Sequence, residues 1–358
     1  MFSTVDSALK AMKRGHPIVV SDSEARENEG DFILPAAAAT AEVIGFINRY
    51  SSGVICAPMH QRRADALDLP PMVSMNTDPK RTAFTVSVDA VDGTTTGISA
   101  GDRAATLRAL ADPCASPGWF SRPGHIFPLV GRSGGVFERD GHTEATLDLC
   151  ALAGTGDTGM LVEVMNDDGT MARRDELARF SRAHALEFIT IDALKAYRLR
   201  NEQLVHVKEE KKILRPDGTW HRVDMQSVPG LPQITVLIRG QIENGSDVRF
   251  CNMDHSLQLP GFEEKDCQIE LASNIRELRY HKSAVLIVVH EGTKDIDSSV
   301  EIQMALGVSA LRLLSPSLSA ITLTQDAQLR QAATFDIECL TRSSTLPTAF
   351  LQEIAVPW

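Results

Sequence analysis

The chain has 358 residues and a formal net charge of -11, with 43% hydrophobic and 23% charged residues. This length exceeds what one hydrophobic core usually serves, so two domains are expected. The acidic balance argues against a general nucleic-acid binder, and no stretch resembles a transmembrane helix or a secretory signal. We therefore expect a cytoplasmic protein that binds neither nucleic acid nor membrane.

The cysteines are scattered along the chain without paired spacing. They are Cys56, Cys114, Cys150, Cys251, Cys267 and Cys339. Such spacing predicts neither a disulfide framework nor a zinc site made of cysteines, so we expect reduced thiols.

Predicted helices and strands alternate along the first part of the chain. Apolar residues at helical spacing predict a helix over residues 5–12, and Thr40 and Ser99 are expected to cap two later helices. Short apolar or alternating runs predict strands at residues 18–20, 32–34, 53–56 and 84–88. Residues 113–135 are rich in proline and glycine and are expected to be irregular.

The same alternation continues to about residue 198. A helix is expected to start near residue 140, followed by a strand at 161–164 and a helix at 173–185. A strand at 188–191 and a short helix capped by Asp192 complete this part. The order of elements predicts an α/β (α+β) domain over residues 1–200.

The composition changes after residue 200. Residues 201–232 contain a mixed-charge run and several Pro-Gly turns, so we expect a linker there. Apolar runs then predict strands at 234–238 and 285–289, with helices at 300–306 and 326–332. We therefore expect a second, smaller α/β domain over residues 233–358.

The acidic stretch at residues 22–31 lies between two predicted strands. Charge runs of this kind are usually solvated turns, but a loop held at the ends of two strands is also a common place for function. Glu27 from this loop and His142 near a predicted helix start would together offer an oxygen and an imidazole ligand. That mixed set is compatible with Mg²⁺ or Mn²⁺, although spacing does not show that the two residues meet.

Other polar residues of the first domain are ambiguous individually. His125 could be a hydrogen-bonded structural histidine or a catalytic one, and the Gly/Thr-rich loop at 92–97 could bind phosphate or be a plain turn. Glu163 interrupts an apolar strand, where a buried carboxylate must be paired or have a raised pKa, as proton-transfer groups do. The polar cluster before the helix near residue 140 lies at a helix N-terminus, which favours anions.

Five motifs in one order resemble 3,4-dihydroxy-2-butanone 4-phosphate synthase of riboflavin biosynthesis. They are RENEGD at 26–31, GTTTGISAGDRAAT at 93–106, RPGHIFPL at 122–129, DGHTEATLDL at 140–149 and NDDGTMAR at 166–173. The resemblance covers residues 5–198 and implies an active site near a homodimer interface. It also implies conversion of D-ribulose 5-phosphate to the four-carbon phosphate and formate, with Mg²⁺ (or Mn²⁺) required.

The resemblance also implies roles for individual residues. Glu27 and His142 match the metal ligands, and His125 and Glu163 match the positions regarded as essential for catalysis. The matching substrate-binding positions are Arg26, Glu27, Asp31, Arg139, Gly141, His142, Thr143 and Glu163. Cys56 matches a cysteine common in the family, with a role either as a reactive thiol or as a small apolar residue. Ser23 and Ala25 depart from the family, which usually has acids there.

The second domain resembles GTP cyclohydrolase II faintly, over residues 306–314. That enzyme needs a zinc site of three cysteines in one short segment, whereas residues 250–271 contain only Cys251 and Cys267. We therefore expect no zinc and no cyclohydrolase activity, although His255 with these cysteines could form another metal site. For the whole chain, the alternative to a synthase is a non-catalytic regulatory or scaffold protein that retains the synthase fold.

Overall fold

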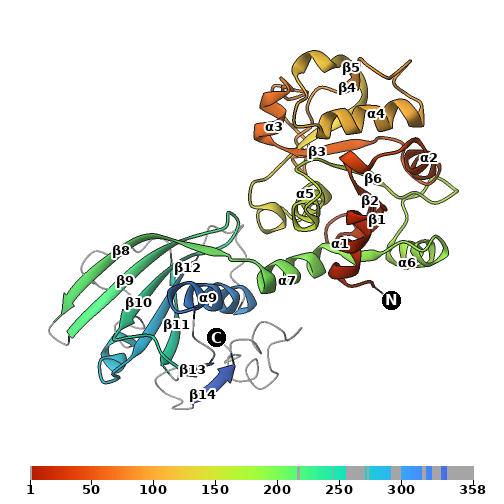
Figure 1. The fold of residues 1–358 in the computed structure, drawn as a ribbon. Helices are drawn as coiled ribbons and strands as arrows, with labels where there is room; N and C mark the ends of the chain where they lie inside the picture. Colours follow the sequence, from red (N-terminus) through yellow and green to blue (C-terminus); the bar gives the residue numbers. More distant parts are fainter. Residues whose placement is uncertain are drawn as a thin grey trace. The chain divides into compact units, whose positions relative to one another are not determined.

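The computed structural model describes residues 2–215, 218–244, 246–254, 271, 274–291, 300–316, 320–324 and 332–336. The chain divides into two compact units, Met1–Lys195 and Ala196–Trp358, each with its own sheet (Figure 1). Within the described ranges, no helix combines the length and the hydrophobicity needed to cross a bilayer.

The first unit is built on a seven-stranded mixed sheet in the order β4-β5-β3-β6-β2-β1-β7. The strands are β1 Ile18–Ser21, β2 Gly30–Pro35, β3 Cys56–His60, β4 Val88–Ala90, β5 Phe120–Gly131, β6 Gly159–Glu163 and β7 Phe188–Thr190. Strands β1 and β2 form an antiparallel pair joined by the acidic loop, and β2 also pairs antiparallel with β6. The acidic loop therefore projects from one end of the sheet.

The helices of the first unit are α1 Val5–Lys13, α2 Ala41–Arg49, α3 Gln61–Ala66, α4 Ala100–Ala111, α5 His142–Ala153 and α6 Arg174–Ala183. Helix α7 Ile191–Asn201 begins in the first unit and ends in the second. The Thr40 hydroxyl accepts a hydrogen bond from the backbone N–H of Val43, and the Ser99 hydroxyl accepts one from Asp102. Both predicted N-caps are thus confirmed, because each hydroxyl satisfies an N–H that the helix leaves unpaired.

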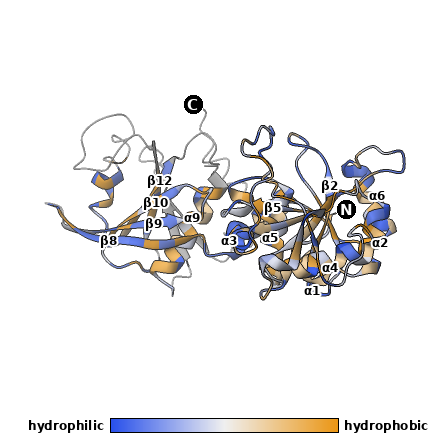
Figure 2. Ribbon diagram, turned by 90° about the horizontal axis from the view of Figure 1, so that it is seen from above, coloured by the Kyte–Doolittle hydropathy of each residue, from blue (hydrophilic) through white to orange (hydrophobic). Residues whose placement is uncertain are grey.

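The central strands are buried on both faces of the sheet. Phe32 and Val162 belong to the large core that includes residues of α2 and α4, whereas Ile33 and Leu161 alternate with them and point to the opposite face. Helices α1 and α5 cover that opposite face. Burial on both sides explains why these strands are continuous apolar runs rather than alternating ones (Figure 2).

The expectation of an irregular segment at 113–135 was wrong, because β5 occupies most of it. β5 accommodates its proline and glycine residues between the neighbouring strands β4 and β3. Pro128 has no N–H to donate, but its carbonyl oxygen still takes part in strand pairing by accepting a hydrogen bond from the N–H of Thr85 at 3.0 Å. Gly124 is needed because a Cβ there would lie 2.0 Å from the backbone of Val88 on the neighbouring strand.

Three other boundaries differ from those predicted. Strand β3 begins at Cys56, where the predicted strand of residues 53–56 ends, and β4 starts at Val88, with Phe84 and Thr85 forming only isolated bridges. Helix α7 begins one residue before Asp192, so Thr190 caps it by accepting a hydrogen bond from Ala193. These shifts of a few residues arise because pairing with neighbouring strands, rather than local hydrophobicity, decides where a strand begins.

The second unit is also built on a seven-stranded sheet, in the order β14-β13-β11-β12-β10-β9-β8. Its strands are β8 Val205–Arg215, β9 Gly218–Ser227, β10 Gln233–Arg239, β11 Asp247–Asp254, β12 Ala284–Glu291, β13 Ala320–Thr324 and β14 Ala332–Asp336, and α9 is Val300–Leu314. The predicted strands at 234–238 and 285–289 and the helix at 300–306 are found as β10, β12 and α9.

Residues 201–232 do not form the expected linker. They contain β8 and β9, which pair antiparallel over most of their length. β8 is an edge strand with exposed charged residues along its middle, including Lys208 and Lys212 (Figure 2). Charged edge strands resist pairing with other chains, and the same charges made this segment resemble a linker.

Part of the second domain's predictions lies outside the described residues. Cys267 and His255 belong to this part, as does the predicted helix at 326–332 apart from Ala332, which begins β14. Cys251 is described and lies buried on β11.

Candidate active site

The acidic loop is folded around the buried carboxylate of Asp22. This carboxylate accepts hydrogen bonds from the N–H groups of Glu27 and Glu29, each at 3.0 Å, and from the Arg26 guanidinium at 3.0 Å. Three donors on one carboxylate hold the loop in a single shape. Asp22 therefore organises the loop, and this acid was not among the predicted site residues.

Arg26 and Glu27 lie together at the open side of this loop. The Arg26 Nη1 atom is 2.6 Å from Glu27 Oε2, and the side chain of Glu27 is 29% exposed. Burial would lower the pKa of Arg26, but the carboxylates of Glu27 and Asp22 outweigh burial and raise it. Outside the loop, Arg173 donates to the carbonyl oxygens of Glu27 and Asn28 at 2.6 and 2.7 Å, so it clamps the loop backbone.

Asp31 and Glu163 lie directly opposite each other on β2 and β6. Asp31 is buried, and its pKa is raised well above its usual range by desolvation and by the nearby Glu163 and other acids. Glu163 is half-buried and accepts a hydrogen bond of 2.6 Å from the hydroxyl of Ser52. The pair alternates with core residues of β2 and β6 and so points to the face that α5 covers.

His142 is the first residue of α5 and lies beside these carboxylates. Its Nδ1 atom is 3.9 Å from Glu27 Oε2 and 3.8 Å from Asp31 Oδ2, while its buried Nε2 atom has no hydrogen-bond partner among the described residues. Desolvation lowers the pKa of His142 to about 4, so the imidazole is neutral at physiological pH. A neutral imidazole whose Nδ1 atom lies beside carboxylates is suited to ligate a cation.

The donor set fits a divalent metal ion. Asp22, Glu27 and His142 each offer one ligand atom, and the three atoms lie within 4.8 Å of one another. Because Asp22 already accepts three hydrogen bonds, Glu27 and His142 are the better placed ligands of the three. Their assignment as metal ligands stays a prediction. Carboxylate oxygens with one imidazole suit Mg²⁺ or Mn²⁺ when water completes the coordination shell.

The segment before α5 places an arginine at the helix N-terminus. Arg139 Nη1 is 2.6 Å from the buried carboxylate of Glu144, and Gly141 is the N-cap of the helix. A Cβ at Gly141 would lie 2.2 Å from Arg139 Nη1 and 2.7 Å from Glu144 Oε2. Only glycine therefore allows this arginine to cross the helix start, where the first N–H groups, including that of Thr143, attract anions.

His125 pairs with a residue that sequence reasoning missed. Asp89 Oδ2 lies 2.7 Å from His125 Nδ1, and Asp89 Oδ1 accepts the His125 backbone N–H at 2.8 Å. An ionised Asp89 would hold the proton on Nδ1 and leave Nε2 as an acceptor. Gly97 closes over this pair, since a Cβ there would be 2.0 Å from Asp89 Oδ2. The alternation of Val88, Asp89 and Ala90 was the only available sequence signal.

Strand register places His125 on the same edge of the sheet as Glu163. Phe127 on β5 and Leu161 on β6 both pair with Cys56 on β3. β5 runs parallel to β3 and β6 runs antiparallel to it, so His125, two residues before Phe127, and Glu163, two residues after Leu161, lie toward the same end of the sheet. They are thus separated by two strand spacings, roughly 9–10 Å, rather than being in contact. Burial and the charges of Glu163 and Asp31 raise the pKa of the Cys56 thiol, which favours its role as a small buried residue over reactivity.

The Gly/Thr-rich loop at 92–97 uses its polar groups internally. The Thr95 hydroxyl donates to Asp102 at 2.9 Å, and the N–H of Gly97 donates to the same carboxylate at 3.0 Å. These bonds favour the interpretation of this loop as a turn anchored on α4.

Comparison with protein families identifies the first unit. Residues 6–197 match the family model described as 3,4-dihydroxy-2-butanone 4-phosphate synthase. A protein of Salinispora arenicola called riboflavin biosynthesis protein RibBA is 46% identical over 247 residues, which cover 69% of this chain and 59% of that protein. The chain thus spans less than two thirds of that relative. A Staphylococcus aureus protein of the same name is 40% identical over 295 residues, covering 81% and 74%.

Solved structures resemble either the first unit or both units. A 3,4-dihydroxy-2-butanone 4-phosphate synthase in complex with two magnesium ions is 44% identical, with a TM-score of 0.55, and covers 56% of this chain and 98% of its own. RibBX from A. baumannii, described as a two-domain synthase of the same kind, is 29% identical, with a TM-score of 0.70, and covers 92% of this chain and 95% of its own. The second structure matches the two-domain architecture.

Proposed function

The chain belongs to the 3,4-dihydroxy-2-butanone 4-phosphate synthase family, and we propose that it converts D-ribulose 5-phosphate to 3,4-dihydroxy-2-butanone 4-phosphate and formate in riboflavin biosynthesis. One observation supports this most directly. The neutral imidazole of His142 lies at the N-terminus of α5, with its Nδ1 atom within 4 Å of the carboxylates of Glu27 and Asp31. A metal site and an anion site therefore adjoin, as a sugar phosphate substrate requires.

Glu27 and His142 would hold the divalent cation, Mg²⁺ or Mn²⁺. When bound, this cation would polarise the ketone and the neighbouring hydroxyl of the substrate and so lower the barrier to enolisation. Arg26 and Arg173 would keep Glu27 in place, because Arg26 contacts its carboxylate and Arg173 its carbonyl oxygen. Glu27 is thereby preorganised before substrate arrives.

The start of α5 would bind the phosphate group. The first N–H groups of the helix, near Gly141 and Thr143, point out of its N-terminus, and the Arg139 guanidinium lies beside them. Arg139 is already oriented by Glu144, so little side-chain entropy would be lost on binding. This arrangement would place the sugar carbons over Asp31 and Glu163.

Three groups are suited to the proton transfers of the reaction. Asp31, with its raised pKa, would hold a proton until the substrate needs one, and Glu163 would accept one beside it. His125 would act through Nε2, since Asp89 holds Nδ1. Because His125 lies two strand spacings from Glu163, these groups would serve different atoms of the substrate.

Formate release tests the proposed function. Purified full-length protein is incubated with ribulose 5-phosphate and Mg²⁺ or Mn²⁺, in parallel with Glu27→Gln and Glu24→Gln. We expect formate from the parent, a loss of roughly 100-fold or more for Glu27→Gln, and little change for Glu24→Gln, whose side chain is 69% exposed in the same loop. No formate from the parent, with Glu27→Gln indistinguishable from it, would support the non-catalytic alternative.

We also propose that the second domain has no GTP cyclohydrolase II activity. This rests on the sequence, in which residues 250–271 contain two cysteines rather than three. Incubation with GTP and Zn²⁺ is expected to release no formate above the level without protein. Formate release that depends on Zn²⁺ would show that the domain builds its metal site from other ligands.

We further propose that the protein is a homodimer. Several apolar side chains of the first unit are more than 45% exposed, which supports a partner surface there. They include Val73 (53%), Met75 (76%), Val91 (55%) and Ile98 (48%). Sedimentation equilibrium is expected to give twice the chain mass of 39.0 kDa, and a monomer at micromolar concentration would contradict this.

A further inference from the structure

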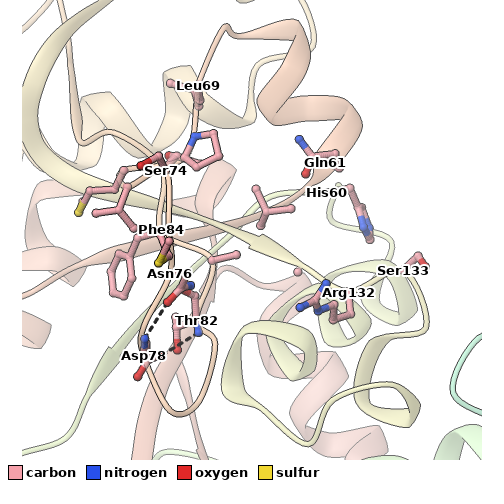
Figure 3. A pocket seen from close by; sticks show the side chains of 18 of the residues that line it. His60, Gln61, Leu69, Ser74, Asn76, Asp78, Thr82, Phe84, Arg132 and Ser133 are labelled. Carbon is pink, nitrogen blue, oxygen red and sulfur yellow. Dashed lines mark hydrogen bonds between the residues drawn. The ribbon is translucent and has the colours of Figure 1, made fainter. Parts of the chain in front are cut away.

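A tight turn at residues 76–82 lines a cavity and also contacts residues of the candidate active site. The cavity, of about 980 Å³, is lined by residues of this turn together with His60, Phe84 and Arg132 (Figure 3). Lys80, which does not line this cavity, contacts Arg26 and Arg139, both of which are among the substrate-binding positions predicted from the sequence. No motif of the sequence pointed to Lys80.

The turn is held rigid by its own polar groups. The N–H of Asp78 donates to the Asn76 side chain at 2.9 Å, and the N–H of Thr82 donates to the Asp78 carboxylate at 2.7 Å (Figure 3). The Asn76 amide closes the turn by donating to the carbonyl oxygen of Thr82 at 2.9 Å. These bonds fix the position of Lys80, because it lies between Asp78 and Thr82.

Lys80 contacts both arginine-bearing segments. Its carbonyl oxygen accepts hydrogen bonds from Nε and Nη2 of Arg139, both at 3.2 Å, and its ammonium donates to the carbonyl oxygen of Arg26 at 3.3 Å. The Thr82 hydroxyl adds a further contact of 3.3 Å to Arg139 Nη2. One residue thus ties the acidic loop to the segment that precedes α5.

We propose that Lys80 is a substrate-positioning residue of the synthase site. Its carbonyl oxygen sets the plane of the Arg139 guanidinium for the phosphate group, and its ammonium keeps the acidic loop at a constant distance from that guanidinium. Holding the Arg139 guanidinium and the acidic loop in place before substrate arrives reduces the entropy lost on binding. The effect of Lys80 therefore falls on substrate binding rather than on the chemical step. This inference rests on the proposed function.

Arg81 provides a matched control. It carries the same charge one residue farther on, is exposed, and its side chain makes no hydrogen bond or ion pair within the described ranges. A general electrostatic attraction of the phosphate group would be weakened equally by Lys80→Gln and Arg81→Gln. The contact to the acidic loop would be weakened only by the first substitution, whereas the Lys80 carbonyl oxygen that holds Arg139 belongs to the backbone and remains in both variants.

Steady-state kinetics of formate release test the inference. We expect Lys80→Gln to raise KM for ribulose 5-phosphate about five-fold, equivalent to roughly 1 kcal/mol at 1.4 kcal/mol per tenfold, with kcat changed less than two-fold. Lys80→Arg should restore most of the parent KM, and Arg81→Gln should leave KM within two-fold. Asp78→Ala, which opens the turn, should raise KM as Lys80→Gln does. Thermal unfolding of Lys80→Gln should match that of Arg81→Gln.

The outcomes separate this inference from the proposed function. If the parent is active and Lys80→Gln and Arg81→Gln have the same KM, the positioning role is wrong while the synthase function stands. A fall in kcat with unchanged KM for Lys80→Gln would also overturn it. If the parent releases no formate with either metal ion, both the proposed function and the inference fail.

Discussion

Asp31 and Glu163 face each other across the antiparallel pair β2 and β6, and both point toward the helix that begins with His142. Two neighbouring carboxylates in a buried site disfavour each other's ionised form. This repulsion adds to desolvation in raising the pKa of Asp31. A divalent cation would relieve this repulsion. Without a metal ion, two ionised carboxylates at this position therefore lower the stability of the fold relative to a pair in which one side chain is uncharged. Unfolding experiments measure this difference.

The first prediction concerns Asp31→Asn in the absence of divalent cations. A raised folded pKa means that the parent binds this proton more tightly when folded, so the parent loses stability as pH rises from the unfolded pKa toward the folded pKa. We expect Asp31→Asn to be more stable than the parent at pH 8, by on the order of 1 kcal/mol, and the difference to vanish near pH 4.

Urea unfolding at both pH values checks this prediction. Adding Mg²⁺ should stabilise the parent more than Asp31→Asn, because the ion compensates a charge that the variant lacks. Asp167→Asn, in an exposed turn, serves as the control and should follow the parent. A parent that is more stable than Asp31→Asn at pH 8 without metal would contradict the prediction.

The second prediction concerns Gly141→Ala. The new Cβ would overlap Arg139 Nη1 and crowd Glu144, so the arginine must leave its position at the start of α5. We expect KM for ribulose 5-phosphate to rise roughly 10-fold or more and stability to fall by about 1–3 kcal/mol, because Glu144 loses the Arg139 guanidinium and keeps only the N–H of Arg132. Gly118→Ala, at a glycine with open space around it, should change neither quantity.

The third prediction concerns Asp89→Asn. The amide would no longer favour the proton on His125 Nδ1, so the tautomer with a free Nε2 would be less populated. We expect kcat to fall on the order of 100-fold with a smaller change in KM. Asp92→Asn, at an exposed position three residues later, should resemble the parent. An unchanged kcat for Asp89→Asn would show that the pair is only structural.

The fourth prediction concerns the boundary between the two units. Contacts divide the chain after Lys195, but α7 continues to Asn201, and Arg198 within it is buried. We therefore expect residues 1–201 alone to fold and to release formate at a rate near that of the full chain. Residues 1–195 should unfold at a lower temperature, because that cut removes half of α7. A formate rate below a tenth of the parent for residues 1–201 would show that the synthase needs its second domain.

The sequence by itself determined most helices and strands of the first unit. The apolar runs and caps predict α1, α2, α4, β1 and β2 because these signals are local and depend on a few neighbouring residues. The pairing of a carboxylate loop with a histidine at a helix start also suggested the metal site, and five motifs in order indicated the family. Glu27 and His142 were therefore candidates before any contact between them was known.

Only the tertiary structure decided which side chains meet. Strand alternation was the only signal for Asp89, and Lys80 had none, because their importance arises from contacts with residues 36 and 59 positions away in the chain. β5 and β8 were missed for a related reason. Proline, glycine and charge usually mark loops, but pairing with neighbouring strands outweighs local preference when backbone groups must be satisfied. Burial, finally, sets the protonation of Asp31 and His142, and burial is a property of the folded chain alone.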